Sequence, residues 1–173
     1  MTDDELRGAL AAPDEVRGLQ VLTLAMVAGA LLLLMVTVVL HATSPAGELA
    51  AGEDDLSLFL ILSGVNAVLF ASAWTLGFGI YRFLTRDLAR AASAYELWSR
   101  LRSAAILRLA LLEGSALFGV AVCLLGVVQG AATGRPWIWA NAAPAVLFSV
   151  LTILTFPTAE RLVRQHSARA GWS

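Results

Sequence analysis

Residues 103–128 form the sequence SAAILRLALLEGSALFGVAVCLLGVV, which contains only two charged side chains, Arg108 and Glu113. A helix needs about 20 apolar residues to cross the roughly 30 Å hydrocarbon core of a bilayer, because each residue adds about 1.5 Å. This stretch is longer than that, so it predicts a membrane-spanning helix. Glu113 then lies in hydrocarbon, where a carboxylate is costly and requires a partner, a proton, an ion or water.

Three further stretches of membrane-spanning length contain no charged residue: 18–47, 56–81 and 136–159. The composition agrees, because 58% of the residues are hydrophobic and only 14% are charged, against about 45–50% and about 25% in soluble domains. The residues before the first stretch are mostly acidic, whereas a signal peptide begins with a basic segment. The apolar run of the first stretch is also too long for a signal peptide, so we expect an uncleaved helix. The sequence predicts one all-α membrane domain over residues 1–173, a four-helix bundle with spans at approximately 18–41, 56–83, 103–129 and 136–157.

The arginines predict the orientation of the bundle. They precede the first predicted span, fill residues 82–102 and follow the last span, whereas residues 41–55 contain none and the third loop contains only Arg135. Basic residues are retained on the cytoplasmic side of membranes. We therefore expect an integral protein of the bacterial inner membrane with both termini in the cytoplasm.

Short amphipathic helices are predicted outside the spans. Thr2 and Glu5 have the spacing of a capping box, which predicts a helix at the N-terminus, and a polar helical pattern resumes at residues 158–169. In the central loop, apolar residues recur three or four apart between Leu88 and Leu101, beside several arginines. That segment either lies on the cytoplasmic surface or prolongs the second and third helices. In the fourth span, Pro144 either kinks the helix or occupies a tolerated first turn.

Small residues recur every fourth position along two spans. Such repeats let the backbones of membrane helices approach closely. We therefore predict that the second and third helices pair as a tight hairpin; the alternative is that the stripe binds another copy of the chain. The predicted packing residues are Ser63, Ala67, Ala71, Thr75 and Gly79 in the second helix and Ser115, Gly119 and Cys123 in the third.

Glu113 is the candidate proton- or ion-binding residue. Arg108 is five residues away, about 140° around the helix, so we expect it to extend towards the cytoplasmic headgroups rather than to pair with Glu113. Counting inward from the cytoplasmic ends predicts four hydroxyl-bearing neighbours at the depth of Glu113: Ser72, Thr75, Ser149 and Thr152.

Residues 107–125, LRLALLEGSALFGVAVCLL, resemble the carboxylate-bearing helix of the proteolipid (c-type) subunits of rotary ATPases. The shared features are a carboxylate in mid-helix, small residues after it and the aromatic–glycine step Phe118–Gly119. The preceding Gly77 and Gly79 and the arginines of the loop extend the local resemblance to residues 77–125. The resemblance implies that Glu113 binds a proton or a cation.

The remaining sequence favours no catalytic chemistry. It contains no nucleophile–base set, metal-ligand cluster or phosphate-binding glycine loop, and the predicted topology separates His41 from His166. The lone Cys123 forms neither a disulfide within the chain nor a metal site. We therefore expect a non-enzymatic protein with no cofactor, metal or nucleic acid. Its expected partners are the lipid bilayer and other copies or other membrane subunits. The predicted function is an accessory or self-associating subunit of a membrane complex; the alternative is proton or cation translocation through an oligomer using Glu113.

Overall fold

A computed structural model describes residues 13–43, 53–84, 86 and 94–158, and every regular element within these ranges is helical. The elements are α2 (Pro13–Thr43), α3 (Glu53–Leu84), α4 (Ala94–Val128), α5 (Ala131–Gly134), the 3-10 helix η2 (Pro136–Ala142) and α6 (Ala143–Leu154). Four stretches are long and apolar enough to cross a membrane: Val16–Thr43, Leu56–Leu84, Trp98–Val128 and Pro136–Leu154. The prediction of an all-helical chain with four helices of membrane-spanning length is confirmed.

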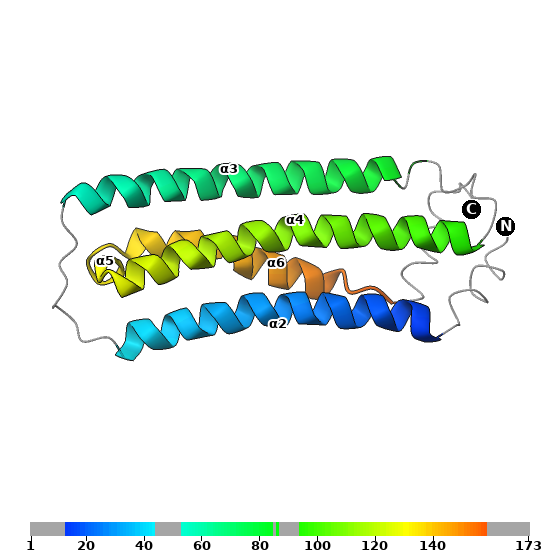
Figure 1. Ribbon diagram of the computed structural model, residues 1–173, viewed down its shortest axis with the longest axis horizontal. Coiled ribbons are helices and arrows are strands. Elements are labelled where there is room, and N and C mark those ends of the chain that lie inside the picture. Colours follow the sequence, from blue (N-terminus) through cyan, green and yellow to red (C-terminus); the bar gives the residue numbers. More distant parts are fainter. Residues whose placement is uncertain (1–12, 44–52, 85, 87–93, 159–173) are drawn as a thin grey trace.

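Helix α4 is the centre of the bundle. It lies between α3 and α2, and α6 packs behind it (Figure 1). The start of α2 and the end of α6 lie at the same end of the bundle. The outward faces of the peripheral helices are apolar, for example at Ile61 and Leu32, which are 63% and 60% exposed. An extensive apolar outer surface is the surface that a bilayer solvates.

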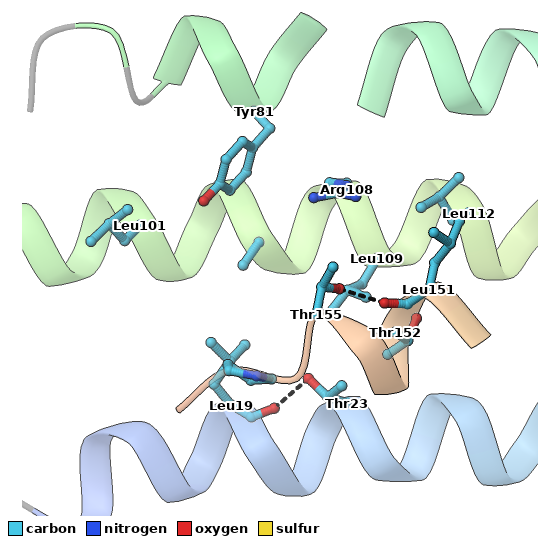
Figure 2. A pocket seen from close by; sticks show the side chains of 12 residues that line it. Leu19, Thr23, Tyr81, Leu101, Arg108, Leu109, Leu112, Leu151, Thr152 and Thr155 are labelled. Carbon is cyan, nitrogen blue, oxygen red and sulfur yellow. Dashed lines mark hydrogen bonds between the residues drawn. The ribbon is translucent and has the colours of Figure 1, made fainter. Parts of the chain in front are cut away.

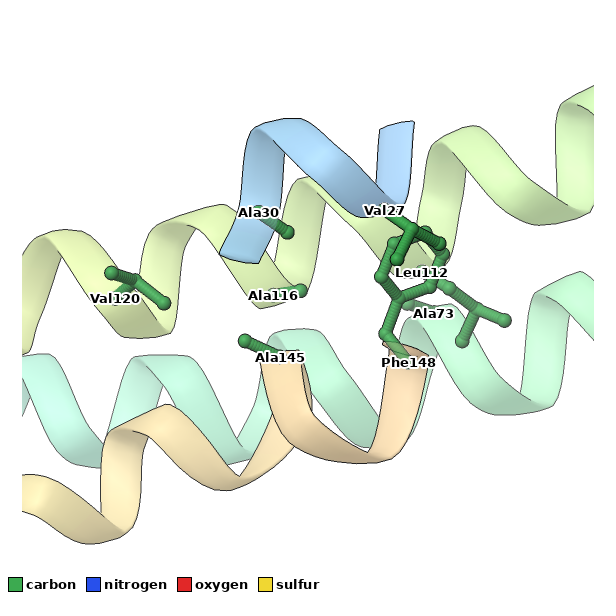
Figure 3. Packing of buried hydrophobic residues seen from close by; sticks show 8 residues of the cluster. All are labelled: Val27, Ala30, Ala73, Leu112, Ala116, Val120, Ala145 and Phe148. Carbon is green, nitrogen blue, oxygen red and sulfur yellow. The ribbon is translucent and has the colours of Figure 1, made fainter. Parts of the chain in front are cut away.

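Buried side chains from all four spans meet in one central cluster (Figure 3). Lipid tails are as apolar as these side chains, so the hydrophobic effect does not drive the helices together inside a bilayer. Close packing and dispersion between the side chains hold the helices together instead. Most members are alanine or valine, which brings the helix backbones close to one another. The central cluster consists of Val27, Ala30, Ala73, Leu112, Ala116, Val120, Ala145 and Phe148.

Helices α3 and α4 pack along a seven-residue repeat. A Cβ atom added to Gly77 of α3 would lie 3.4 Å from Cγ of Arg108, and one added to Gly126 of α4 would lie 3.5 Å from Cε1 of Phe59. Between these two contacts Asn66 and Ala73 are buried, each seven residues after the previous buried position. This spacing keeps a seam of side chains on one face, as in antiparallel coiled coils.

The predicted small-residue stripe of the second helix does not form this seam. Ala67, Ala71, Thr75 and Gly79 are exposed, and only Ser63 is half-buried. Residues four apart are displaced by about 40° around a helix of 3.6 residues per turn, so five of them spread over about 160°. A stripe with that spacing winds off the α4-facing side. Its binding to another copy of the chain stays a prediction.

The predicted stripe of α4 is buried and also receives η2. Ser115, Gly119 and Cys123 are all buried. A Cβ atom on Gly119 would overlap the backbone carbonyl oxygen of Asn141 and lie 3.0 Å from Nδ2 of Asn66. The hydrogen atom of glycine is therefore what allows η2 to lie directly against α4.

The fourth span is built from two kinds of helix. Gly130 adopts a left-handed conformation (φ 70°) after α4, a conformation that glycine accepts without steric cost. The chain then passes through α5 into η2, and Pro144 lies in the first turn of α6. A 3-10 helix rises about 2.0 Å per residue, so η2 and α6 together extend about 32 Å, enough to cross the hydrocarbon with 19 residues.

Residues 94–101 of the predicted central-loop helix belong to α4. The helix continues unbroken from Ala94, with Trp98 and Leu101 buried against the bundle and an exposed ion pair of 2.6 Å between Arg100 and Glu96. In these residues the chain prolongs the third span. The predicted N-terminal helix, residues 159–169 of the helical pattern predicted at 158–169, and residues 88–93 of the predicted loop segment lie outside the described residues.

Candidate functional site

Glu113 is the central residue of the third span, with 15 residues on each side between Trp98 and Val128. Its side chain is half-buried on the flank of α4, next to the exposed residues Ala110 and Gly114. Among the described residues it makes no hydrogen bond or ion pair. The chain therefore places a carboxyl group at mid-span without giving it an internal partner.

The two hydroxyls predicted on α3 do not approach Glu113. The contacts of Gly77 with Arg108 and of Asn66 with Gly119 place Ser72 level with Glu113, because the helices are antiparallel. Ser72 is exposed, however, as is Thr75. The Oγ1 atom of Thr75 donates to the carbonyl oxygen of Ala71 on its own helix, at 2.8 Å. The predicted depth is consistent with the helix register, but both side chains lie on another face of α3.

The two hydroxyls predicted on α6 are buried, but neither binds Glu113. The Oγ atom of Ser149 donates to the carbonyl oxygen of Ala145 at 2.8 Å. Thr152 is 4% exposed and lines a cavity together with Arg108. The structure thus brings Thr152 together with the arginine of α4, not with its glutamate.

This cavity of about 110 Å³ lies where α2, α3, α4 and the end of α6 converge (Figure 2). Its polar lining includes Arg108, Tyr81 and the three threonines Thr23, Thr152 and Thr155. Leucines form most of the rest of the wall: Leu19, Leu101, Leu109, Leu112 and Leu151. The cavity combines one cation with hydroxyls and apolar side chains, a lining suited to a small amphiphilic group.

Arg108 packs against aromatic rings of α3. Its guanidinium carbon lies 4.2 Å from the ring centroid of Phe78 and 5.7 Å from that of Tyr81, distances at which the ring faces attract a cation. Its Nε atom is buried and has no hydrogen-bond partner in the described part of the chain. The sequence predicted that Arg108 extends to the headgroups. In the structure its side chain is half-buried and lines the cavity, and its extension to the headgroups stays a prediction.

A second polar group holds η2 against α3 and α4. Nδ2 of Asn66 donates to Oδ1 of Asn141 at 3.0 Å, and Nδ2 of Asn141 donates to Oγ of Ser63 at 2.8 Å and to the carbonyl oxygen of Ile138 at 3.0 Å. The sulfur of Cys123 contacts the same carbonyl oxygen at 3.3 Å. The sequence pattern did not predict the pairing of the two asparagines. The available signal was their similar depth in two spans.

No known protein family, curated protein or solved structure matches this chain. The resemblance of residues 77–125 to proteolipid subunits therefore gains no support from these comparisons.

Proposed function

We propose that the chain is a non-catalytic four-span membrane protein that acts as an accessory or self-associating subunit of a membrane complex. The distribution of arginines supports an orientation with both termini in the cytoplasm, and thus a bacterial inner-membrane location. In this proposal the chain contributes a surface for assembly rather than a reaction.

The unpartnered position of Glu113 is the observation that carries the proposal. A charged residue at the centre of a membrane helix costs roughly 2.5–3.5 kcal/mol, and such residues face a protein interior or a polar partner. Within the described ranges nothing bonds to Glu113, so a second chain supplies the partner. The adjacent Ala110 and Gly114 are small and exposed, which allows another helix to approach α4 closely.

Glu113→Leu tests this proposal. Because the glutamate makes no bond within the described chain, we expect the monomer in detergent to melt at an unchanged or slightly higher temperature. Self-association in vesicles, measured by energy transfer between labelled chains as the lipid-to-protein ratio is varied, should weaken about 3- to 18-fold. That range corresponds to one hydrogen bond between membrane helices, about 0.6–1.7 kcal/mol.

Ser72→Leu is the matched control, since Ser72 is exposed at the same depth on α3. It should leave both measurements unchanged. If the purified chain stays monomeric, the same pair of variants is compared by cross-linking in native membranes, where Glu113→Leu should remove a cross-linked partner. A lower melting temperature of the Glu113→Leu monomer would contradict the proposal, because it would reveal a partner within the chain.

The second candidate function is proton or cation translocation through an oligomer. It is favoured by the mid-span position of a half-buried carboxyl group that the described chain leaves unpaired. A single chain offers no polar relay to it among the described side chains, so the pathway would require several copies.

Glu113→Gln separates the two functions. Glutamine retains hydrogen bonding but cannot exchange a proton, so assembly should persist under both functions. In vesicles with an imposed proton or sodium gradient, translocation predicts that the wild-type flux falls to background in this variant. A flux that is absent from the wild type, or equal in the variant, rules translocation out and leaves the assembly function.

A further inference from the structure

The cavity at Arg108 has a cation but no anion. In the described part of the chain no carboxylate lies within ion-pair distance of its guanidinium. Glu113 is on the same helix but about 140° around it. The rings of Phe78 and Tyr81 attract the guanidinium without accepting its hydrogen bonds in the plane, and Nε has no acceptor. A buried donor without an acceptor is destabilising, and more so when it is charged.

Thr152 supplies an additional free donor. Thr23 and Thr155 donate to carbonyl oxygens of their own helices, Leu19 and Leu151, at 2.7 Å each, as Figure 2 shows. Thr152 lines the same cavity from α6, yet its hydroxyl makes no hydrogen bond within the described residues. The hydroxyl of a helical threonine that is only 4% exposed can bond to a carbonyl oxygen on the preceding turn of its helix. Here it is available to a group in the cavity.

The cavity runs from one end of the spans inward to Leu112, the residue beside the mid-span Glu113. It is bordered by Thr155 and Pro157, just beyond the last residue of the fourth span, and by Leu19 near the start of the first. Both segments belong to the end of the bundle where α2 begins and α6 ends. The proposed orientation makes this the cytoplasmic leaflet, where basic pockets between membrane helices bind anionic headgroups.

We propose that this cavity binds the oxyanion of an acidic amphiphile, a carboxylate or a phosphate group. The guanidinium of Arg108 pairs with the oxyanion, and the hydroxyl of Thr152 donates to it. Arginine suits this role because its planar donors match two oxygens of one acid group. A volume of about 110 Å³ accommodates the few non-hydrogen atoms of one acid group. The hydrocarbon part of the ligand therefore lies outside the cavity.

Binding by the full chain purified in a neutral detergent tests the proposal. Native mass spectrometry and thermal melting would compare phosphatidylglycerol, phosphatidylcholine, oleate and inorganic phosphate. We expect phosphatidylglycerol or oleate to bind more tightly than phosphatidylcholine. Arg108→Gln should weaken binding of the acidic ligand by about tenfold or more, and Thr152→Val by about threefold, the losses expected for a charged and a neutral hydrogen bond.

Arg102→Gln is the matched control, because it removes the same charge from an exposed position on the same helix and should leave the affinity unchanged. If Arg108→Gln does not fold, Thr152→Val carries the test alone, since valine keeps the shape of threonine. Binding of the acidic lipid without an effect of inorganic phosphate identifies a lipid headgroup; an equal, Arg108-dependent effect of phosphate identifies a soluble oxyanion. Equal binding of phosphatidylglycerol and phosphatidylcholine, or equal losses in Arg108→Gln and Arg102→Gln, would overturn the proposal.

Discussion

Gly119→Ala is expected to lower the melting temperature of the detergent-solubilised chain by about 5–10 °C. The added methyl group would overlap the carbonyl oxygen of Asn141 and crowd Nδ2 of Asn66 at 3.0 Å. The obstructing atoms are backbone and a buried amide, so η2 has to move away from α4. Overpacking of this kind costs about 1–3 kcal/mol and occasionally more, and about 2–4 °C is lost per kcal/mol in a chain of this length.

Gly114→Ala is the matched control on the same helix. A Cβ atom there meets nothing within 4 Å, so alanine should leave the melting temperature unchanged or raise it, since alanine stabilises a helix by about 1 kcal/mol relative to glycine. The difference between the two variants, measured at one scan rate, therefore isolates the contact with η2. Equal melting temperatures would show that η2 does not lie against α4 as described here.

The lengths of the spans could be predicted from the sequence, because hydrophobicity and a rise of about 1.5 Å per residue determine them. The side of each helix that packs could not be predicted with the same accuracy. On α3, the repeat of small residues at every fourth position suggested one face, whereas the seam follows Phe59, Asn66 and Ala73 at every seventh. An error of one residue changes depth by only about 1.5 Å but changes direction by about 100°.

The surroundings of Glu113 illustrate the same limit. Counting from the span ends gave Ser72 the depth that the register of α3 and α4 also indicates, but the side chain is exposed. Thr152 was predicted as a neighbour of the glutamate, and the structure places it at the cavity of Arg108 instead. Depth follows from composition along one helix, whereas the facing of side chains depends on how four helices rotate against each other.

The 3-10 helix η2 was also beyond the sequence signals. The sequence predicted a span that begins at residue 136, but nothing in the pattern of residues 136–142 indicates that they wind more tightly than an α-helix. The 3-10 helix η2 contacts two other helices. The ring of Trp139 lies edge-on to His41 of α2, with centroids 5.2 Å apart, and Asn141 forms hydrogen bonds with α3. Such tertiary contacts override local helix preference.

The pair Asn66 and Asn141 should show strong energetic coupling. Replacing either by alanine removes the hydrogen bond of 3.0 Å between them and leaves the other amide buried without this partner, because Asn66 and Asn141 are 3% and 4% exposed. We expect each single variant to lose about 2 kcal/mol of unfolding free energy. The double variant should lose about 1 kcal/mol less than the sum, because the bond between the two amides is lost already in either single variant. Unfolding by titration with a denaturing detergent provides these free energies.

Thr23→Ala is the control partner for the cycle, since Thr23 bonds within α2 to Leu19 and lines the cavity at the opposite end of the bundle from Asn141. Its effect should add to that of Asn141→Ala within about 0.5 kcal/mol, as for distant sites. Additive losses in Asn66→Ala and Asn141→Ala would contradict a direct bond between the amides. A coupled loss would instead establish that the hydrogen bond between Asn66 and Asn141 holds η2 against α3. Together with the comparison of Gly119→Ala and Gly114→Ala, it would show that η2 is held both by close steric packing at Gly119 and by this hydrogen bond.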